Sequence, residues 1–379
     1  MMENSEMVKF IAAKWQREQA SHLAEWRASE RGLANRQLST LCEAISDTVF
    51  SQSNDVHELA DKLESTLSRC DQLQFDSFEE AGAYTLLHLA DRYGRVGQVL
   101  ERLFVSGHLP IRLTRLSVLD VGAGPAPGLY AVNDFYDELA QWASETRQVP
   151  KFTTATNLHA IDRGKAWPRL LHHLSETLIL KRRDLPSNSR TLPFNTAYSD
   201  FTGFSTRKKH IEAREINARS IQDEYDVDEA PTIEVARQLG QQDALTAPSA
   251  YDLIFVSNFL TMTEMTHQFQ EEIRDLAKGL TPGGLLIALG ATGKHYPAIW
   301  NRVQSIVAST GLVPVPNFHE PIAANEDSDR AHIIHQHERD FLTLIRESGG
   351  QLPSSLEKAI DNPMFPKFQA MVWKNRRSN

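Results

Sequence analysis

Apolar residues in the first hundred positions recur at intervals of three and four, the spacing of one face of an α-helix. A long helix is predicted over residues 83–104, just before the first strand-like run of the chain. We therefore predict a helical N-terminal region over residues 1–108. Two further apolar stripes support it: Phe10, Trp15, Leu23 and Trp26, and then Val56, Leu59, Leu63 and Leu67.

From residue 109 onward, short apolar runs alternate with helical segments. This alternation predicts an α/β domain over residues 109–379, with a mostly parallel sheet that helices cover on both faces. A helix over residues 269–280 should stop at a Thr-Pro-Gly-Gly turn, which leads into an apolar strand at 285–289. The other runs that we interpret as strands are 117–121, 158–162, 195–201 and 251–260.

Residues 205–248 break this pattern, because they are dense in charge and poor in apolar side chains. Such a segment cannot bury enough apolar surface to offset the entropy of ordering. We expect an insertion between the third and fourth strands, either a lid over the substrate side or a solvated surface excursion.

Composition places the chain among ordinary globular proteins, with 41% hydrophobic and 23% charged residues. Its two cysteines, Cys42 and Cys70, exclude a disulfide scaffold and a four-cysteine metal site, so we expect no structural metal and a reducing compartment. The net charge of −9 opposes general affinity for nucleic acid. Basic runs at 181–183, 207–210 and 374–377 nevertheless leave RNA open as a partner.

The N-terminal residues show no secretory signal, and no apolar run approaches the ~20 residues that a membrane helix requires. We expect a cytoplasmic protein with no membrane partner.

Residues 117–132 carry the clearest chemical pattern, an apolar strand that ends in a carboxylate and leads through a glycine turn into a helix start. Gly122 and Gly124 permit a tight turn and leave room for a ligand against bare peptide, next to the positive end of the helix dipole. This predicts a nucleotide-like cofactor. The dinucleotide-binding pattern is G-x-G-x-x-G, and when it is counted from Gly122 the third glycine position is Pro127. This departure from the pattern weakens the case for NAD or FAD.

The spacing Asp120-x-Gly122-x-Gly124, with the small Ala126 following, resembles motif I of the class I S-adenosylmethionine-dependent methyltransferases. The resemblance implies a seven-stranded, Rossmann-like sheet with the cofactor S-adenosyl-L-methionine across its carboxyl strand ends. It assigns Asp120 to the methionine ammonium, and Gly122, Ala123 and Gly124 to the cofactor loop.

Acidic residues end the next two predicted strands. Asp162 is the candidate to accept hydrogen bonds from the ribose hydroxyls, although it could instead cap the turn before Gly164. It follows Gly128 by 34 residues, more than the roughly 20 expected, so an insertion within 148–157 is assumed. Asp200 and Phe201 are placed near the adenine, with the phenylalanine ring packing on the base.

Residues 251–260 resemble the fourth strand of the same family, where a polar residue after the strand reaches the methyl-donor side. Ser257 and Asn258 are the candidates here. No Asn-Pro-Pro-Tyr or Asp-Pro-Pro-Tyr is present, so the usual device for methylating an exocyclic base amine is missing. Residues 311–316 and 368–373 can supply the closing antiparallel pair of the family sheet.

A narrower resemblance covers residues 83–100 and 119–125, which are similar to the mitochondrial small-ribosomal-subunit methyltransferase-like family. The chain lacks that family's metal-binding cysteines, and Gly-Pro-Gly-Thr has become Gly-Pro-Ala-Pro at 124–127.

We therefore expect an S-adenosylmethionine-dependent methyltransferase that acts on an unidentified small molecule or macromolecule. The alternatives are an RNA- or ribosome-associated methyltransferase and a cofactor-binding assembly protein without turnover. The histidines within 332–338 have the residue types of a metal site, but a surface segment is the interpretation that we favour. Candidate general bases, with no choice among them, are His267, His295, Tyr198 and Glu264.

Overall fold

The computed structural model describes most of the chain outside residues 202–250. Four helices precede the first strand: α1 (Asn4–Ala28), α2 (Ala34–Gln52), α3 (Val56–Arg69) and α4 (Phe78–Val105). The described residues are 4–29, 34–53, 55–69, 73–111, 116–146, 156–185, 195–198, 201, 251–293, 295–318, 320–323, 328–352, 354, 356 and 367–376.

A seven-stranded sheet in the order β3-β2-β1-β4-β5-β7-β6 forms the centre of the α/β fold. β1 pairs in parallel with both β2 and β4, and only the pairings of β7 with β5 and β6 are antiparallel. The strands are β1 (Leu116–Val121), β2 (Thr156–Asp162), β3 (Asn195–Tyr198), β4 (Tyr251–Ser257), β5 (Leu280–Ala291), β6 (Val313–Pro314) and β7 (Phe368–Lys374).

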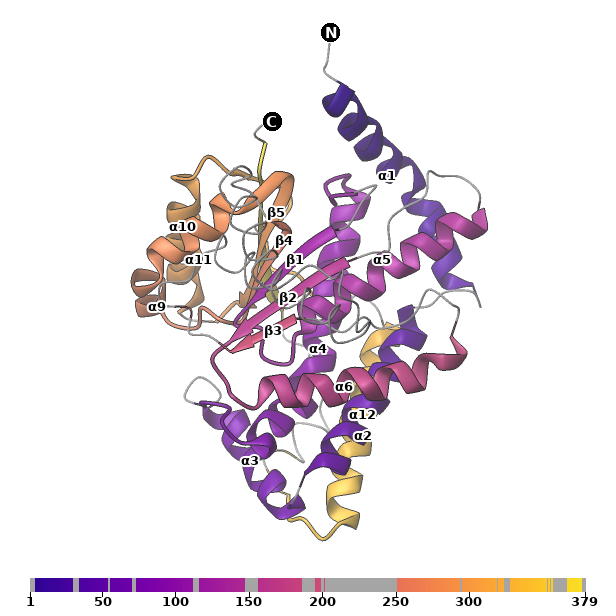
Figure 1. The fold of residues 1–379 in the computed structure, drawn as a ribbon, viewed down its shortest axis with the longest axis vertical. Coiled ribbons are helices and arrows are strands. Elements are labelled where there is room, and N and C mark those ends of the chain that lie inside the picture. Colours follow the sequence, from indigo (N-terminus) through magenta and orange to yellow (C-terminus); the bar gives the residue numbers. More distant parts are fainter. Residues whose placement is uncertain are drawn as a thin grey trace, which may run out of the picture.

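Helices cover both faces of this sheet (Figure 1). One face carries α4, α5 (Pro127–Thr146) and α6 (Trp167–Lys181), which is followed by the short 3-10 helix η2 (Arg182–Asp184). The other face carries α9 (Thr263–Gln268), α10 (Gln270–Lys278) and α11 (Tyr296–Ala308). α2, α3 and α12 (Ser328–Glu347) lie together at the lower end of the view.

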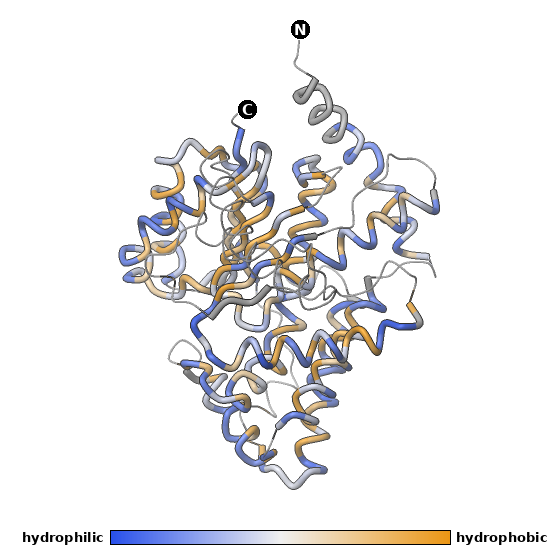
Figure 2. Tube along the Cα trace, viewed as in Figure 1, coloured by the Kyte–Doolittle hydropathy of each residue, from blue (hydrophilic) through white to orange (hydrophobic). Residues whose placement is uncertain are grey.

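The hydrophobic core continues from the N-terminal helices into the sheet. Leu38 of α2, Leu86 of α4, Val118 of β1 and Leu129 of α5 belong to one cluster of buried side chains. Leu119 points to the opposite face and joins a second cluster with the helices there, as the alternation of side chains along a strand requires. Figure 2 shows the hydrophobic positions gathered along the central strands and the helix sides that face them.

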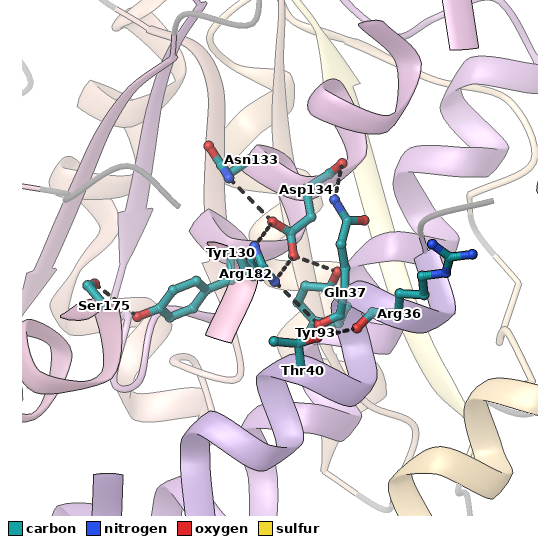
Figure 3. A network of polar contacts seen from close by, with 9 residues as sticks. All are labelled: Arg36, Gln37, Thr40, Tyr93, Tyr130, Asn133, Asp134, Ser175 and Arg182. Atoms are coloured by element: carbon teal, nitrogen blue, oxygen red, sulfur yellow. Dashed lines mark hydrogen bonds and ion pairs between the residues drawn. The ribbon is translucent and has the colours of Figure 1, made fainter. Parts of the chain in front are cut away.

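A buried polar network ties these helices together (Figure 3). The Arg182 guanidinium donates to both carboxylate oxygens of Asp134 in α5, at 2.6 and 2.7 Å, and Tyr93 of α4 donates to the same carboxylate at 2.9 Å. Arg182 also donates to the carbonyl of Gln37 in α2. The ion pair is almost fully buried, and burial together with Asp134 keeps Tyr93 in its neutral form by raising its pKa well above the usual value.

Two local predictions need correction. The Thr-Pro-Gly-Gly segment does not separate helix from strand, because β5 already begins at Leu280 and the segment forms an irregularity within it. The histidine-bearing segment 332–338 is not simply a surface excursion, because it lies in α12 against α2 and α4. Its His337 is buried, and burial lowers the pKa of this imidazole to about 4.

Candidate functional site

The loop between β1 and α5 is shaped by left-handed backbone. Gly122 has φ +62°, Gly124 has φ +52° and Ala126 has φ +57°. Glycine adopts this region without steric cost, whereas an L side chain does not. The loop lies at the point where the strand order reverses, between β2 and β4, which is where parallel α/β sheets bind ligands at their carboxyl strand ends.

A cavity of about 380 Å³ opens at this loop. Its walls come from the carboxyl ends of β1, β2 and β4, from α4, and from the helices that follow β4. This volume lies within the usual range for small-molecule sites. The described residues that line it are Leu73, Phe75, Tyr84, Arg92, Gly122, Gly124, Ile161, Asp162, Arg163, Trp167, Phe201, Asn258, Phe259, Thr261, Met262, Met265, Gln268, Phe269 and Tyr296.

Asp162 braces the glycine loop from the end of β2. One carboxylate oxygen accepts from the Gly124 amide and the other from the Gly164 amide, each at 2.9 Å. Burial raises the pKa of this carboxyl, against the effect of the two amides. Asp162 therefore caps the turn before Gly164, which was the alternative role considered from the sequence. A carboxylate has about four acceptor positions, so two backbone bonds leave capacity for a ligand hydroxyl.

The space beside Gly122 is filled by protein. A Cβ built on Gly122 would lie 2.4 Å from Cδ2 of Phe259. The phenylalanine ring can therefore occupy this position only because residue 122 is a glycine. Phe259 packs against Phe201 and Phe269, with ring centroids 5.1 and 5.5 Å away. A Cβ on Gly124 would meet Tyr84 and Trp167 at 3.7 Å, which is ordinary van der Waals contact, so nothing crowds this glycine on the cavity wall.

Asp120 lies behind the loop and is absent from the described wall of the cavity. Its side chain is 0% exposed, and no hydrogen bond of ordinary geometry reaches either oxygen from the described residues. Burial raises the pKa of this carboxyl well above its usual value, with the nearby Gly128 amide opposing the shift. The structure does not place Asp120 on the described wall, and its contact with a ligand ammonium stays a prediction.

Of the other expected site residues, some line the cavity and others lie buried behind its lining. Phe201 and Asn258 line the cavity, and Asn258 holds a left-handed φ of +51°. Ala123 and Ser257 are buried behind the wall: the Ala123 amide donates to the Ile161 carbonyl at 3.1 Å, and Ser257 accepts from the Asn258 side chain. Asp200, like the expected insertion over 205–248, lies outside the described residues.

The aromatic wall beside Gly124 was not anticipated from the sequence. Phe75, Tyr84 and Trp167 form a cluster with centroid separations of 4.9 to 5.9 Å. Gly164 makes the close packing possible, because a Cβ there would lie 2.6 Å from the Trp167 indole nitrogen. That glycine, two residues after the acid of β2, was the one sequence signal for this wall.

The candidate bases are not brought to the cavity. His267, His295 and Glu264 do not belong to its described lining, and the side chain of Tyr198 lies outside the described part. Among the described residues, three metal-ligand side chains come together only at His172, His173 and Glu176 on α6, where two of the three are exposed, and such groups are common without an ion.

No protein-family model matches the chain, and no curated protein sequence matches it significantly. Among solved structures, N-methyltransferase NodS from Bradyrhizobium japonicum WM9 with S-adenosyl-L-homocysteine is 14% identical, covers 84% of this chain and 100% of its own, and has a TM-score of 0.34. Cyclopropane synthase MmaA2 from Mycobacterium tuberculosis is 11% identical, with coverage of 88% and 98% and a TM-score of 0.39. The [4+2]-cyclase SpnF is 11% identical, with coverage of 85% and 94% and a TM-score of 0.35.

None of the helices in the described part of the chain is long and apolar enough to cross a membrane.

Proposed function

We propose that this chain binds S-adenosyl-L-methionine in the cavity at the β1 loop and transfers its methyl group to an acceptor. The observation that carries the proposal is the carboxylate of Asp162, which joins the end of β2 to the Gly124 amide at the cavity wall. An acid at the end of the second strand, next to a glycine loop at the reversal of strand order, is the arrangement that holds the ribose of a nucleoside cofactor.

The sheet supports the same proposal. Its order, with β7 as the antiparallel partner of β5, agrees with the seven-stranded sheet that the resemblance to class I methyltransferases implies. The start of α5 weighs against a dinucleotide, because Pro127 begins the helix where a dinucleotide fold would place its third glycine.

The residues on the wall suit an adenosyl ligand. Asp162 can accept from ribose hydroxyls, Phe201 offers a ring face for a base, and Gly124 allows a ligand to lie against bare peptide. Bound there, the cofactor would supply a methyl group activated by its sulfonium. The protein then has to hold the acceptor atom in line with the methyl group and exclude water. A general base is not needed when the acceptor atom is already unprotonated.

The acceptor side of the cavity carries apolar side chains beside the polar Thr261 and Gln268. Met262, Met265 and Phe269 follow β4, and Tyr296 begins α11 after β5. A small acceptor with an apolar body fits this wall and the volume of about 380 Å³. No feature of the described cavity favours the RNA alternative, since only Arg92 and Arg163 are cationic on its wall and the whole chain carries −9.

Calorimetric titration of the full chain with S-adenosylmethionine, S-adenosylhomocysteine and NAD tests the proposal. We expect saturable binding of the first two and none of NAD. A screen for methyl transfer to metabolite, protein and RNA extracts then identifies the acceptor class and separates an enzyme from a binding protein. NAD binding without a response to S-adenosylmethionine contradicts the proposal.

A further inference from the structure

Arg92 is a charged group on the cavity wall that has no acidic partner among the described residues. It is partly buried on α4, so its charge is not fully solvated. The neighbouring Arg95 differs, because it forms an ion pair with Asp91 at 2.6 Å on the same helix. A guanidinium on a cavity wall that has no carboxylate partner can bind an anionic group of a ligand.

Tyr84 holds this guanidinium in a defined place. The Arg92 side chain lies over the Tyr84 ring at 4.7 Å from the centroid, and one of its nitrogens donates to the Tyr84 hydroxyl. A guanidinium has five N–H donors in a planar fork, so most of its donors remain for another acceptor. The stacking and the single hydrogen bond fix the fork before any ligand arrives, which lowers the entropy that binding must offset.

The same tyrosine places the fork beside the glycine loop. A Cβ on Gly124 would lie 3.7 Å from Cε1 of Tyr84, so the tyrosine ring that carries the guanidinium lies next to this glycine. Gly124 also donates its amide to Asp162. The carboxylate of Asp162 and the guanidinium of Arg92 therefore both belong to the wall of the cavity that contains Gly124.

The surroundings do not neutralise Arg92. His88, one helical turn earlier, packs on Tyr84, and burial together with Arg92 and Arg95 lowers the pKa of its imidazole well below the usual value. This shift disfavours the imidazolium, so His88 adds no second positive charge beside Arg92. The one described acid on the cavity wall is Asp162, whose two oxygens already accept the Gly124 and Gly164 amides.

We propose that Arg92, positioned by Tyr84, is a carboxylate subsite that binds the α-carboxylate of the methionine part of the cofactor. The inference rests on the proposed function, because S-adenosylmethionine has one carboxylate, which lies at the end of the methionine chain that is attached to C5′ of the ribose. A planar carboxylate accepts two parallel N–H bonds from a guanidinium, which a compact ammonium cannot reproduce.

Two ligands that differ at this end test the subsite. S-adenosylhomocysteine carries the amino-acid part, and 5′-methylthioadenosine lacks it, so the ratio of their dissociation constants isolates the contribution of that part. In Arg92→Met, we expect binding of S-adenosylhomocysteine to weaken by about 10- to 100-fold, while binding of 5′-methylthioadenosine changes less than about threefold. Arg92→Lys should fall between the wild type and Arg92→Met.

Arg163→Gln is the matched control, because Arg163 lies on the same wall but is exposed and follows Asp162. We expect this variant to leave the ratio of the two dissociation constants unchanged. Binding of 5′-methylthioadenosine by Arg92→Met also shows that the variant is folded.

Equal weakening of both ligands in Arg92→Met, or no weakening of either, overturns the subsite while leaving the proposed function intact. Failure of the wild type to bind either ligand overturns both.

Discussion

Replacing Gly122 by alanine should destabilise the chain much more than the same change at Gly124. Both glycines have φ near +50° to +60°, so each substitution has a similar backbone cost of about 1–2 kcal/mol. The added Cβ meets different surroundings. At Gly122 it would lie 2.4, 2.7 and 2.8 Å from three atoms of Phe259, whereas at Gly124 the nearest atoms are 3.7 Å away.

The Phe259 ring cannot yield freely, because Phe201 and Phe269 pack on it. Overpacking of this kind costs about 1–3 kcal/mol. We therefore expect Gly122→Ala to lower the free energy of unfolding by about 2–5 kcal/mol and Gly124→Ala by about 1–2 kcal/mol. Urea unfolding of the ligand-free protein, followed by tryptophan fluorescence, measures both.

The cause is isolated by repeating both changes in a Phe259→Ala background. There the cost of Gly122→Ala should fall to that of Gly124→Ala, which gives a coupling free energy of about 1–3 kcal/mol between Gly122 and Phe259. Equal costs of the two glycine substitutions in the wild-type background, or a coupling near zero, would refute the packing argument.

Three further outcomes are expected. Asp162→Ala should lower the free energy of unfolding by about 1–3 kcal/mol, because it removes the acceptor of two backbone amides. It should also weaken binding of S-adenosylhomocysteine, because the ribose contact is lost. An unchanged free energy of unfolding in urea would contradict the role of Asp162 in bracing the loop. Asp134→Ala should lower the free energy of unfolding by about 3–5 kcal/mol, because it leaves the Arg182 guanidinium buried without its carboxylate. The double variant Asp134→Leu with Arg182→Met should lose less stability than this single variant. A larger loss in the double variant would contradict this explanation. Burial raises the pKa of Glu338 to about 7, so its contribution to stability is present below the unfolded value of about 4.5 and is lost as the pH rises through 7. Glu338→Gln should therefore match the wild type in thermal unfolding at pH 4 and exceed it at pH 8, and a constant difference across this range would contradict the shift.

The strands were predictable where burial on both faces makes the sequence continuously apolar. The runs at 117–121 and 158–162 correspond to β1 and β2 within two residues, because local composition and tertiary environment agree there. The Thr-Pro-Gly-Gly segment was misjudged because its local turn preference competes with the sheet. Its Gly283 amide donates to the Asn375 carbonyl at 2.7 Å, a contact that no local pattern reveals.

For the site, the sequence indicated the residues whose role depends on the backbone. Gly124 and Asp162 were found because a glycine turn after a strand and an acid at a strand end are local patterns. Arg92 and Phe259 were missed because their roles depend on how α4 and the segment after β4 pack against the loop. The same limitation applies to Asp120: its spacing suggests a ligand contact, but its depth behind the loop is set by α5.

One cluster of buried side chains joins the N-terminal helices to one face of the sheet, which has a consequence for degradation of the protein. A ligand that binds only the folded chain suppresses the openings of this cluster that also disrupt the ligand site, including those that begin in helices that never touch the ligand. At a ligand concentration of roughly 100 times the dissociation constant, such openings become about 100-fold rarer. The rate at which proteases cut the buried helices and strands of this cluster should therefore fall as the supply of the small molecule held at Gly124 rises.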